Sequence, residues 1–501
     1  MNSPRSFQDL VHWLEAGEGA RLLRIAALVS GVLVLSIVVA WKQFHGPASE
    51  LTLLQADVAR QLARGEGFTT LVNFPQTAAV LAARGQRFDP RAPYPELHHA
   101  PLYSLVIAGG LRLMPGSWRE ELFLKFPAPP DGFGADYFLL GLNLVLLWLA
   151  AWLAYDVGRR VFSPRAGAVA AFAFLLSVPV WQQAVSVNGT LLHAVLVLAA
   201  FRILVRLEER AESGDSRLPM TGLALLGLVS GLLFLADYSA GAFVLVALGY
   251  AGLRYEGKSR LFALCIVAAC ALVVAAPWMV RNARLTGNPV GLASQQLALK
   301  AGDPTAEPAS WRAAFNSQAP SIDLNKLGNK VLSHLQESIK SQLWSGGGLF
   351  MTAFFIAGAL YRFRSRPADN LRWTFVAAFL VLLLSYAAFN SGESERIPAI
   401  YLSPLIMVFG AGFFFVLVES SPFVSAWPRL AAGGLLLAQA LPLLHDAMEP
   451  RRIHFHYPPY FPPLFASLRQ ELDRRAPSGR YGVMADVPAG VAWYGQQRTW
   501  A

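Results

Sequence analysis

A single acidic residue, Asp57, stands in the stretch LTLLQADVARQLARGEG, which follows the first long apolar run of the chain. On a helix, Leu51, Leu54 and Val58 share one apolar face, and Asp57 lies at its margin with Arg60 on the polar side. A carboxylate placed in this way can take a proton from a hydroxyl group as a general base. It can equally form a surface ion pair with Arg60, contributing about 0.2–0.5 kcal/mol. The pattern leaves both interpretations open.

Four basic residues stand where apolar runs begin or end, at places suited to binding an anion. His98 and His99 open the segment HHAPLYS, Arg281 lies in PWMVRN, and Arg396 precedes IPAIYLSPL. Cationic donors form strong, charge-assisted hydrogen bonds to phosphate oxygens. Each residue also has a simpler interpretation: the histidines can cap a helix, Arg281 can reach from a span to the interface, and Arg396 can pair with Glu393 in a loop.

Three further residues are possible members of the same site. Asp237, in FLADYSAGA, falls at a turn between two apolar runs, where it could act chemically or cap a helix. Asn188 lies in AVSVNGTLLHA, and Glu393 belongs to the short polar segment before Arg396. Asn188 also begins a glycosylation sequon, but we expect no glycan so close to a membrane.

The composition places these residues in a membrane protein. Of the 501 residues, 54% are hydrophobic and only 15% are charged, whereas soluble chains have about 25% charged residues. Several apolar runs approach the roughly 20 residues that a spanning helix needs. The net charge of +10 does not indicate a nucleic-acid partner, because the basic residues cluster at the ends of apolar runs. The sequence therefore predicts an all-α polytopic membrane protein whose partners include membrane lipids.

The apolar runs predict about eleven transmembrane helices. Basic residues stand between these runs at 159–165, 206–210, 254–260 and 362–372. If the short run 100–114 lies in the outer interface without crossing, all of these loops fall on the cytoplasmic side, as the positive-inside rule requires. This topology places the N-terminus in the cytoplasm and the C-terminus outside it.

Two domains follow from this topology. Residues 1–446 form the transmembrane domain, with outer loops at about 42–136 and 280–343, and residues 447–501 form an extracytoplasmic C-terminal segment. That segment contains YPPYFPPLF, a helical SLRQELDRR and two strand-like pieces, RYGVMADV and VAWYG. It reads as the beginning of a small α/β module. Either it packs on the other outer loops or the module is incomplete, and the sequence does not decide between these explanations.

Several motifs occur in an order similar to that of the GT-C superfamily of membrane glycosyltransferases. ADVARQLARGEGF resembles the acidic helix in the family's first loop, and HHAPLYSLVIA resembles its H/K-P-P-L-Y segment. AAPWMVRNARLTGNPV is similar to its PW-x-x-RN-x-x-x-x-G-x-P stretch, and ERIPAIYLSPL resembles its R-x-x-x-P-x-x-x-P entry into a late span. The chain is most similar to bacterial relatives of the protein O-mannosyltransferases and to the lipid A aminoarabinose transferase.

The resemblance implies an enzyme of a bacterial-type cytoplasmic (inner) membrane. Such an enzyme moves a hexosyl or pentosyl group, with inversion, from a polyprenyl-phosphate donor to a glycan, lipid or protein acceptor on the outer face. It implies that Asp57 is the acceptor-side base. It also implies that the donor phosphate is bound by His98, His99, Arg281 and Arg396.

Two positions depart from the family pattern. Val58 stands where a second acid is common, and Asn188 lies where a further acid is expected before a span. We therefore expect no cofactor and no clear metal site, although a divalent metal stays possible. The main alternative function is a transporter or lipid flippase, but the spans are clean and the acids lie in outer loops, which favours an enzyme. A ligase or polymerase of lipid-linked glycans is chemically close, and the sequence does not separate it.

Overall fold

The structure, a computed structural model, describes most of the chain. The described residues are 18–47, 49–86, 89, 92–124, 133–214, 217–301, 307–392, 396–449, 462–475 and 482–501. The chain divides into two compact units, Met1–Phe44 with Leu444–Ile453 and His45–Leu443 with His454–Ala501. We call the first the terminal unit and the second the main unit.

The terminal unit contains helix α2 (Glu18–Gln43) and the last residues of helix α20 (Pro428–Met448). Most of the large apolar side chains of α2 are exposed, as in a helix that faces lipid. Within the unit, the Lys42 ammonium donates hydrogen bonds to the carbonyl oxygens of Ala447 and Glu449. By length and composition, α2 is a candidate membrane span.

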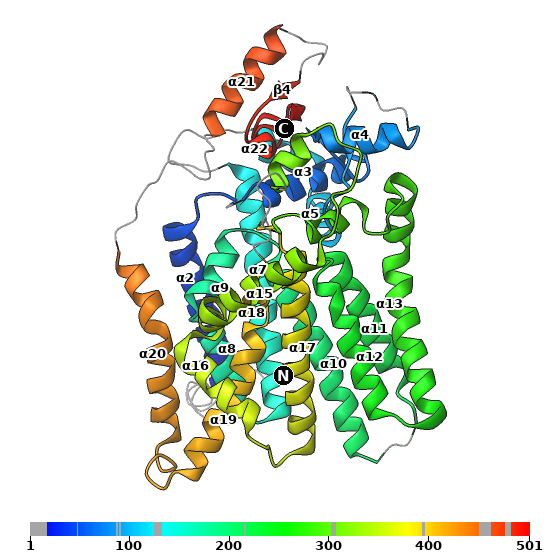
Figure 1. Cartoon of the computed structure of the whole chain (residues 1–501). Coiled ribbons are helices and arrows are strands. Elements are labelled where there is room, and N and C mark those ends of the chain that lie inside the picture. The colour runs from blue at the N-terminus through cyan, green and yellow to red at the C-terminus, as the bar shows by residue number, and fades with distance from the viewer. Residues whose placement is uncertain are drawn as a thin grey trace. The chain divides into compact units, whose positions relative to one another are not determined.

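The main unit is built on a bundle of helices (Figure 1). Its members are α7 (Gly134–Val161), α8 (Pro164–Leu175), α9 (Val178–Val185), α10 (Thr190–Glu212), α11 (Met220–Ala236), α12 (Phe243–Arg254), α13 (Gly257–Thr286), α16 (Leu343–Leu360), α17 (Arg366–Phe389) and α19 (Ser403–Ser420). Helix α11 packs mainly on α13, α16 packs on α19, and α7 packs on α8 and α10. This pairing buries an apolar core along the bundle.

Glycines let two of these helix pairs approach closely. A Cβ atom on Gly158 of α7 would lie 2.7 Å from the Cα atom of Gly167 in α8. On α11, a Cβ atom on Gly231 would lie 2.7 Å from the carbonyl oxygen of Ala271 in α13. Small residues at helix contacts are the usual means of tight packing in membranes, where apolar burial alone gives little preference for a partner.

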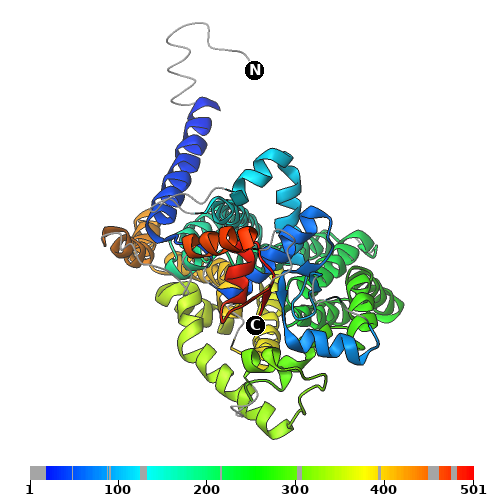
Figure 2. The ribbon, with the colours of Figure 1, turned by 90° about the horizontal axis from the view of Figure 1, so that it is seen from above.

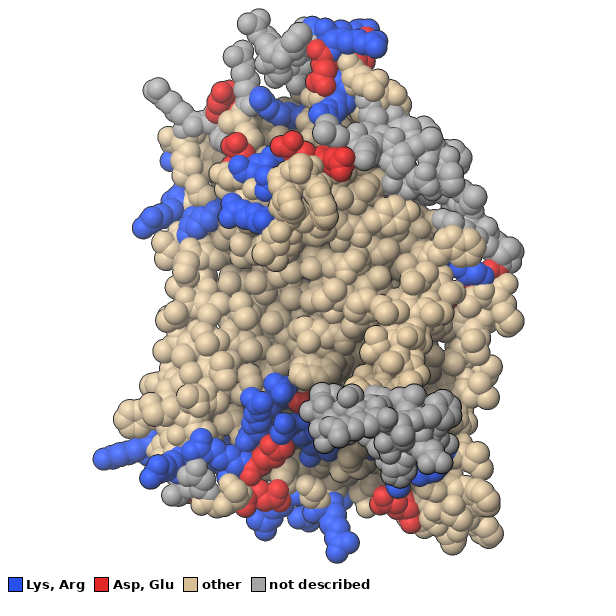
Figure 3. Space-filling model, turned by 180° about the vertical axis from the view of Figure 1, so that it is seen from behind, with Lys and Arg blue, Asp and Glu red and all other residues tan. Residues whose placement is uncertain are grey.

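Eight described helices are long and apolar enough to cross a membrane, or nine if the bent pair α8 and α9 forms one span. Figure 3 shows a broad band free of charged side chains between two groups of charged ones. The chain is therefore a mostly helical, polytopic membrane protein. The count of eleven stays a prediction, because two expected spans are the shorter apolar helices Met220–Ala236 and Ala240–Arg254. The predicted interfacial run forms helix α5 (Leu102–Leu113).

Elements of the first loop and of the C-terminal segment gather at one end of the bundle (Figure 1). From the first loop come α3 (Glu50–Arg64), β1 (Thr69–Thr70), β2 (Val72–Asn73), α4 (Pro75–Ala83), β3 (Tyr94–Pro95), α5 and α6 (Gly116–Leu124); the C-terminal segment adds α21 (Pro462–Arg475), β4 (Val483–Met484), α22 (Pro488–Gly495) and β5 (Thr499–Trp500). We call this set the cap. Helices α3 and α22 pack on each other, and the two segments lie side by side in the end-on view of Figure 2.

The segment between α13 and α16 supplies smaller elements. They are η2 (Gly291–Leu297), α14 (Pro308–Ala313), α15 (Leu324–Glu337) and the π-helical turn η4 (Ser338–Gln342). The short elements η1 (Ala240–Ala242) and α18 (Pro398–Tyr401) stand beside α17. Lys330 of α15 donates hydrogen bonds to the carbonyl oxygens of Gln296 and Leu299, and so ties this segment together.

Helix α3 forms where the sequence predicts it. The Ser49 hydroxyl accepts a hydrogen bond from the Thr52 amide at the start, and Gly65 ends the helix at a positive φ of 92°, a conformation that glycine adopts without strain. Nearly every residue from Thr52 to Ala63 is buried, the polar ones included. The polar side of α3 is therefore an internal surface of the cap.

The C-terminal segment packs on the first loop, as one of the two explanations proposed. Strand β5 lies between β2 and β4 and pairs in parallel with both, so a first-loop strand completes the small sheet. A separate antiparallel pair joins β1 to β3. The expectation of a strand at VAWYG is wrong. These residues lie in α22, where Pro488 fixes a helical first turn and Val491 to Gly495 are all buried.

The buried Trp493 should be one of the residues on which the cap depends. Its ring is fully buried, and its indole N–H donates to the Asp136 carboxylate over 2.8 Å. Trp493→Ala should lower the free energy of unfolding by about 3–5 kcal/mol and make the segment 482–501 sensitive to protease. Trp118→Ala, at a position 66% exposed, is the matched control. Equal melting temperatures for both variants would contradict this assignment.

Candidate functional site

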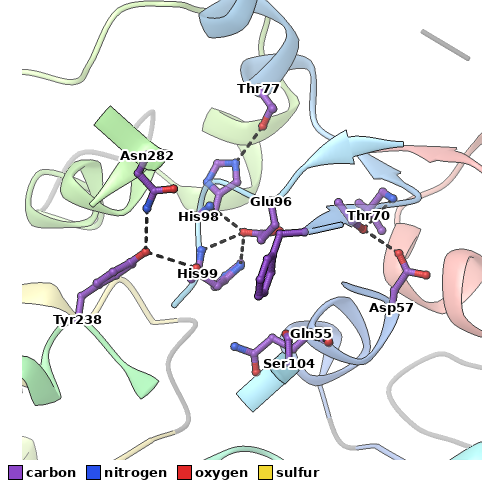
Figure 4. Close-up of polar contacts among 12 residues, drawn as sticks. Gln55, Asp57, Thr70, Thr77, Glu96, His98, His99, Ser104, Tyr238 and Asn282 are labelled. Carbon is purple, nitrogen blue, oxygen red and sulfur yellow. Dashed lines mark hydrogen bonds and ion pairs between the residues drawn. The ribbon is translucent and has the colours of Figure 1, made fainter. Parts of the chain in front are cut away.

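Asp57 is the centre of a buried hydrogen-bond cluster inside the cap. Its Oδ2 atom accepts from the Thr70 hydroxyl at 2.8 Å and from the Leu71 amide at 2.7 Å (Figure 4). Its Oδ1 atom accepts from the Arg60 guanidinium, which also donates to the carbonyl oxygens of two α22 residues, Ala492 and Trp493. Asp57 is fully buried and Arg60 is 1% exposed. The pair therefore connects α3 to both β1 and α22.

These contacts alter both interpretations of Asp57. The predicted pair with Arg60 exists, but it is buried and not on the surface. Burial lowers the pKa of Arg60, and the adjacent Asp57 carboxylate opposes that effect. A polar cavity lies between the cap and the bundle, and Asp57 is not among the residues that line it. Its role as a base stays a prediction, and its three hydrogen bonds give the carboxylate a different, structural task.

A polar cavity lies where the cap meets the bundle. It is lined by Leu51, His98, His99, Ala100, Asp237, Tyr238, Ser239, Gln296, Tyr386, Phe389, Asn390 and Arg396. Of the predicted residues, His98, His99, Asp237 and Arg396 meet here. The cavity holds about 40 Å³, which is room for water but far below the roughly 300 Å³ of an ordinary small-molecule site. A ligand larger than a few water molecules would fit here only if the lining side chains moved.

Glu96 positions both histidines. Its Oε1 atom accepts from the backbone amides of His98 and His99, at 2.7 and 2.9 Å, and contacts His99 Nδ1 at 3.0 Å (Figure 4). Burial by itself would raise the pKa of Glu96, but His99 and the other donors lower it to about 2. Glu96 is therefore ionised at neutral pH. With Nδ1 of His99 held by this carboxylate, Nε2 is the ring atom left to act on a ligand.

His98 is more enclosed than His99. Its Nε2 atom lies 3.2 Å from the Thr77 hydroxyl, and its ring packs edge-on against Phe74 at 5.3 Å between centroids. Burial, with the nearby Arg312 as a second cause, lowers the pKa of His98 well below its ordinary value. His98 is thus neutral at pH 7, while His99 presents the more accessible ring.

Tyr238 and Arg281 hold the histidine segment from the bundle side. The Tyr238 hydroxyl donates to the His99 carbonyl and accepts from Trp278 and Asn282 (Figure 4). The Arg281 guanidinium donates to the carbonyl oxygens of Glu96 and Phe68, at 2.9 and 3.1 Å, and stacks over Trp278 at 4.5 Å. Arg281 does not line the cavity. It secures the backbone that carries the histidines.

Asp237 and Arg396 form an ion pair on the opposite wall. The Arg396 Nη1 atom lies 3.6 Å from Asp237 Oδ2 and donates to the Ala236 carbonyl at 3.0 Å. Its Nη2 atom donates to Gln55 of α3. The Ser239 amide and hydroxyl both donate to Asp237 Oδ1. Asp237 ends α11 and Ser239 precedes η1, so Asp237 closes the turn between them and is not the N-cap of a helix. Burial by itself would raise the pKa of Asp237, but Arg396, His193 and the Ser239 donors together lower it.

Of the two remaining candidate site residues, the structure describes Asn188 but not Glu393. Asn188 is buried and does not line the cavity; its Oδ1 atom accepts from the amide of Thr190, the first residue of α10, at 3.1 Å. A buried Asn188 agrees with the expectation that this sequon carries no glycan. The neighbouring Gly189 lies against Arg396, where a Cβ atom would come within 3.2 Å of Nη2. Glu393 lies outside the described residues.

Sequence reasoning missed Glu96, Tyr238 and Gln55. The spacing of Glu96, two and three residues before the histidines, could have indicated a carboxylate that binds their amides. Gln55 lies two residues from Asp57 in sequence, yet it is the α3 side chain that reaches Arg396. Among the described residues, no three His, Cys, Asp or Glu side chains gather as ligands of a metal ion would.

No protein-family model matches the chain, and no curated protein matches it. Solved structures do match. The oligosaccharyltransferase of Archaeoglobus fulgidus, in complex with Zn and sulfate, matches with a TM-score of 0.57 at 14% identity over 94% of this chain and 62% of that one. ArnT of Cupriavidus metallidurans, bound to undecaprenyl phosphate, matches with a TM-score of 0.54 at 14% identity over 95% of this chain and 85% of that one. The chain has a GT-C-like fold.

A further match within this GT-C-like fold is AglB of Archaeoglobus fulgidus, in complex with an inhibitory peptide and a dolichol-phosphate. Its TM-score is 0.52 at 12% identity, over 94% of this chain and 64% of that one. The chain spans less than two thirds of the length of these oligosaccharyltransferases. These matches confirm the predicted GT-C-like fold, while the count of eleven spans stays a prediction. At such low identity they establish the fold and leave the chemistry to the residues of this chain.

Glu96 should make the stability of the protein depend on acidic pH. Its pKa of about 2 in the folded state lies below its ordinary value of 4.5, which corresponds to about 3 kcal/mol of stabilisation. That contribution is complete above pH 4.5 and is lost as the pH falls towards 2. The melting temperature should therefore drop more steeply on acidification in the native protein than in Glu96→Gln. Glu66→Gln, at an exposed loop position, should behave like the native protein; parallel curves for all three would refute the assignment.

Proposed function

We propose that the protein is a glycosyltransferase that moves a sugar from a polyprenyl-phosphate donor to an acceptor on the outer face of the cytoplasmic membrane. The GT-C-like fold supports this proposal, because ArnT with this fold was solved with undecaprenyl phosphate and AglB with a dolichol-phosphate. The observation that carries it is the cavity between cap and bundle. There a carboxylate, Asp237, lies beside two groups able to bind phosphate, Arg396 and His99.

In the proposed reaction, the acceptor hydroxyl attacks the anomeric carbon of the sugar. A bond forms between the acceptor oxygen and that carbon, and the bond from the carbon to the donor phosphate oxygen breaks. The hydroxyl proton passes to a carboxylate, and polyprenyl phosphate leaves. A single displacement of this kind inverts the anomeric configuration, as in inverting glycosidases, where one carboxylate activates the nucleophile.

We assign the acceptor-side carboxylate to Asp237. It lines the cavity and its side chain is 20% exposed, whereas Asp57 is fully buried and does not line it. Its Oδ2 atom lies 3.6 Å from the Arg396 guanidinium, which is longer than a hydrogen bond. When a donor phosphate draws Arg396 towards itself, Oδ2 becomes available to the acceptor proton.

Arg396 and His99 are the proposed ligands of the donor phosphate. The departing phosphate gains charge as the bond breaks, and cationic donors in an enclosed site stabilise that charge strongly. Glu96 holds Nδ1 of His99 and so orients its ring. His98 and Arg281, expected to bind the phosphate directly, act in this proposal by holding the segment that carries His99.

The acceptor route is proposed to pass the second loop. Gln296 belongs to η2 and lines the cavity. The Lys330 ammonium of α15 donates a hydrogen bond to the Gln296 carbonyl oxygen. A cavity of about 40 Å³ has to widen before a sugar can enter, and Gln296 belongs to a short element on its rim. The sugar and the acceptor are not specified by these contacts.

The proposed topology places the cap outside the cell and the opposite ends of α10 and α13 in the cytoplasm. Single cysteines introduced into a protein carrying Cys265→Ser and Cys270→Ser test this. Ser317→Cys should react with a membrane-impermeant maleimide in intact cells, because residue 317 lies beyond α13 and is exposed. Ser213→Cys, exposed after α10, should react only after permeabilisation. Labelling of Ser213→Cys in intact cells would overturn the orientation.

A transfer assay with polyprenyl-phosphate sugar in liposomes tests the catalytic assignment. Asp237→Asn keeps the size of the side chain but removes its basicity, so turnover should fall about 100-fold or more with little change in donor KM. Asp57→Asn should keep most of its turnover per folded molecule and lose stability, because breaking a buried ion pair costs about 3–5 kcal/mol. The reverse pattern, an inactive but stable Asp57→Asn and an active Asp237→Asn, would assign the base to Asp57. Lipid movement without cleavage of the sugar–phosphate bond would favour the flippase alternative.

A further inference from the structure

Helix α15 (Leu324–Glu337) continues through the turn η4 into α16. Together these elements form one helical stretch of 37 residues, Leu324–Leu360, which is among the candidate membrane spans. At a rise of 1.5 Å per residue the stretch would measure about 55 Å, whereas the hydrocarbon core of a bilayer is about 30 Å thick. Part of the stretch therefore lies outside that core.

A kink divides the stretch at Gly348. This residue has a φ of 68° and a ψ of 171° inside α16, a conformation that glycine alone adopts readily. A Cβ atom at this position would also lie 2.7 Å from Oε1 of Gln439 in α20. The chain changes direction at Gly348, so the residues before the kink and those after it can lie in different surroundings.

The part before the kink is too polar to cross a membrane. Its first turns contain Asn325, Lys326, Asn329 and Lys330, and charged side chains are costly in the hydrocarbon core. Trp344, four residues before the kink, is 39% exposed, and tryptophan is enriched where a membrane meets water. These residues indicate that α15 lies at the surface of the membrane.

One side of α15 packs on the protein. Lys330 is buried, and its ammonium group donates to the carbonyl oxygens of Gln296 and Leu299 at 2.6 and 2.9 Å. The neighbouring Leu327 and Val331 are partly buried, and α15 packs on α17. These contacts hold the helix beside the bundle and beside η2.

Another side of α15 is apolar and exposed. Leu324, Leu332 and Ile339 have exposed fractions of 79%, 55% and 55%. They are eight and seven residues apart, close to two helical turns each, so they share one side of the helix. Beyond the kink, Leu349 is 64% exposed. The exposed apolar surface of α15 is thus followed along the chain by that of the span.

The position of α15 in the molecule suits contact with a membrane surface. Figure 1 shows α15 running across the bundle at the level where the cap begins, and in Figure 2 the yellow-green helices α15 and α16 lie at the edge of the bundle. A helix with one apolar and one polar side lies in the plane of the membrane interface, with its apolar side buried by about 5–10 Å.

We propose that α15 docks on the lipid bilayer, on the side of the membrane where the cap lies. Leu324, Leu332 and Ile339 insert among the lipids, and the polar side of the helix faces water. The partner is the bilayer because the apolar surface of α15 continues into that of the span α16. Through Lys330 the docked helix holds η2, whose Gln296 lines the cavity at the cap. The inference does not depend on the proposed sugar transfer.

Fluorescence quenching of the full chain in lipid nanodiscs tests this proposal. The two native cysteines are replaced, as Cys265→Ser and Cys270→Ser, and an environment-sensitive maleimide dye is attached to Leu324→Cys, Leu332→Cys or Ile339→Cys. Lipids that carry a nitroxide at different depths of the acyl chain should place all three dyes at one shallow depth, about 5–10 Å into the interface. A helix along the membrane normal would instead separate the first and last dyes by about 22 Å.

The control is Ser333→Cys, because Ser333 is exposed and lies next to Leu332 towards the polar side of α15. Its dye should be quenched by aqueous iodide, whereas the dye at Leu332→Cys should be protected from iodide. This pair alone decides the proposal if the other two variants do not fold. Equal quenching of the pair by iodide would overturn it, as would depths about 22 Å apart. Protection in detergent that is lost on dilution would assign the apolar side to a second copy of the chain and would overturn it too.

Discussion

The cap of this protein depends on one buried ion pair, between Asp57 and Arg60. A buried charge is tolerated only when it is paired and its remaining hydrogen-bonding groups are satisfied. Here the Thr70 hydroxyl and the Leu71 amide donate hydrogen bonds to the second oxygen of the Asp57 carboxylate, and carbonyl groups of α22 accept hydrogen bonds from the Arg60 guanidinium. The pair thereby fixes two segments, the one around β1 and α22, to helix α3. Because Gln55 of that helix also binds Arg396, the geometry of the cavity depends on the same element.

The cavity itself is organised by two further pairings of opposite charge. Glu96 holds both amides and one ring nitrogen of the histidine segment, and Asp237 stands beside Arg396 on the opposite wall. His99 and Arg396 thus each have a carboxylate beside them. In the proposed function, such preorganisation means that little rearrangement of charge is needed when a phosphate enters.

Local patterns predicted the helices well and the long-range contacts poorly. The apolar face of α3 and its ending at Gly65 follow from residues within one short segment, so the helix could be foreseen. The helix at VAWYG could not, because its apolar residues suit a buried strand as well as a buried helix. What decides between them is the place of α22 between α3 and α21, which no local pattern contains.

The sequence by itself determined that the chain is a helical membrane protein with a likeness to the GT-C superfamily, and it supplied candidates for binding a phosphate. These follow from composition, periodicity and motif order, which are properties of neighbouring residues. Only the tertiary structure decided that Asp57 is buried while Asp237 lines the cavity. The reason is physical: Arg60 bonds to a carbonyl 433 residues away in the chain, and whether a carboxylate is buried depends on such distant partners.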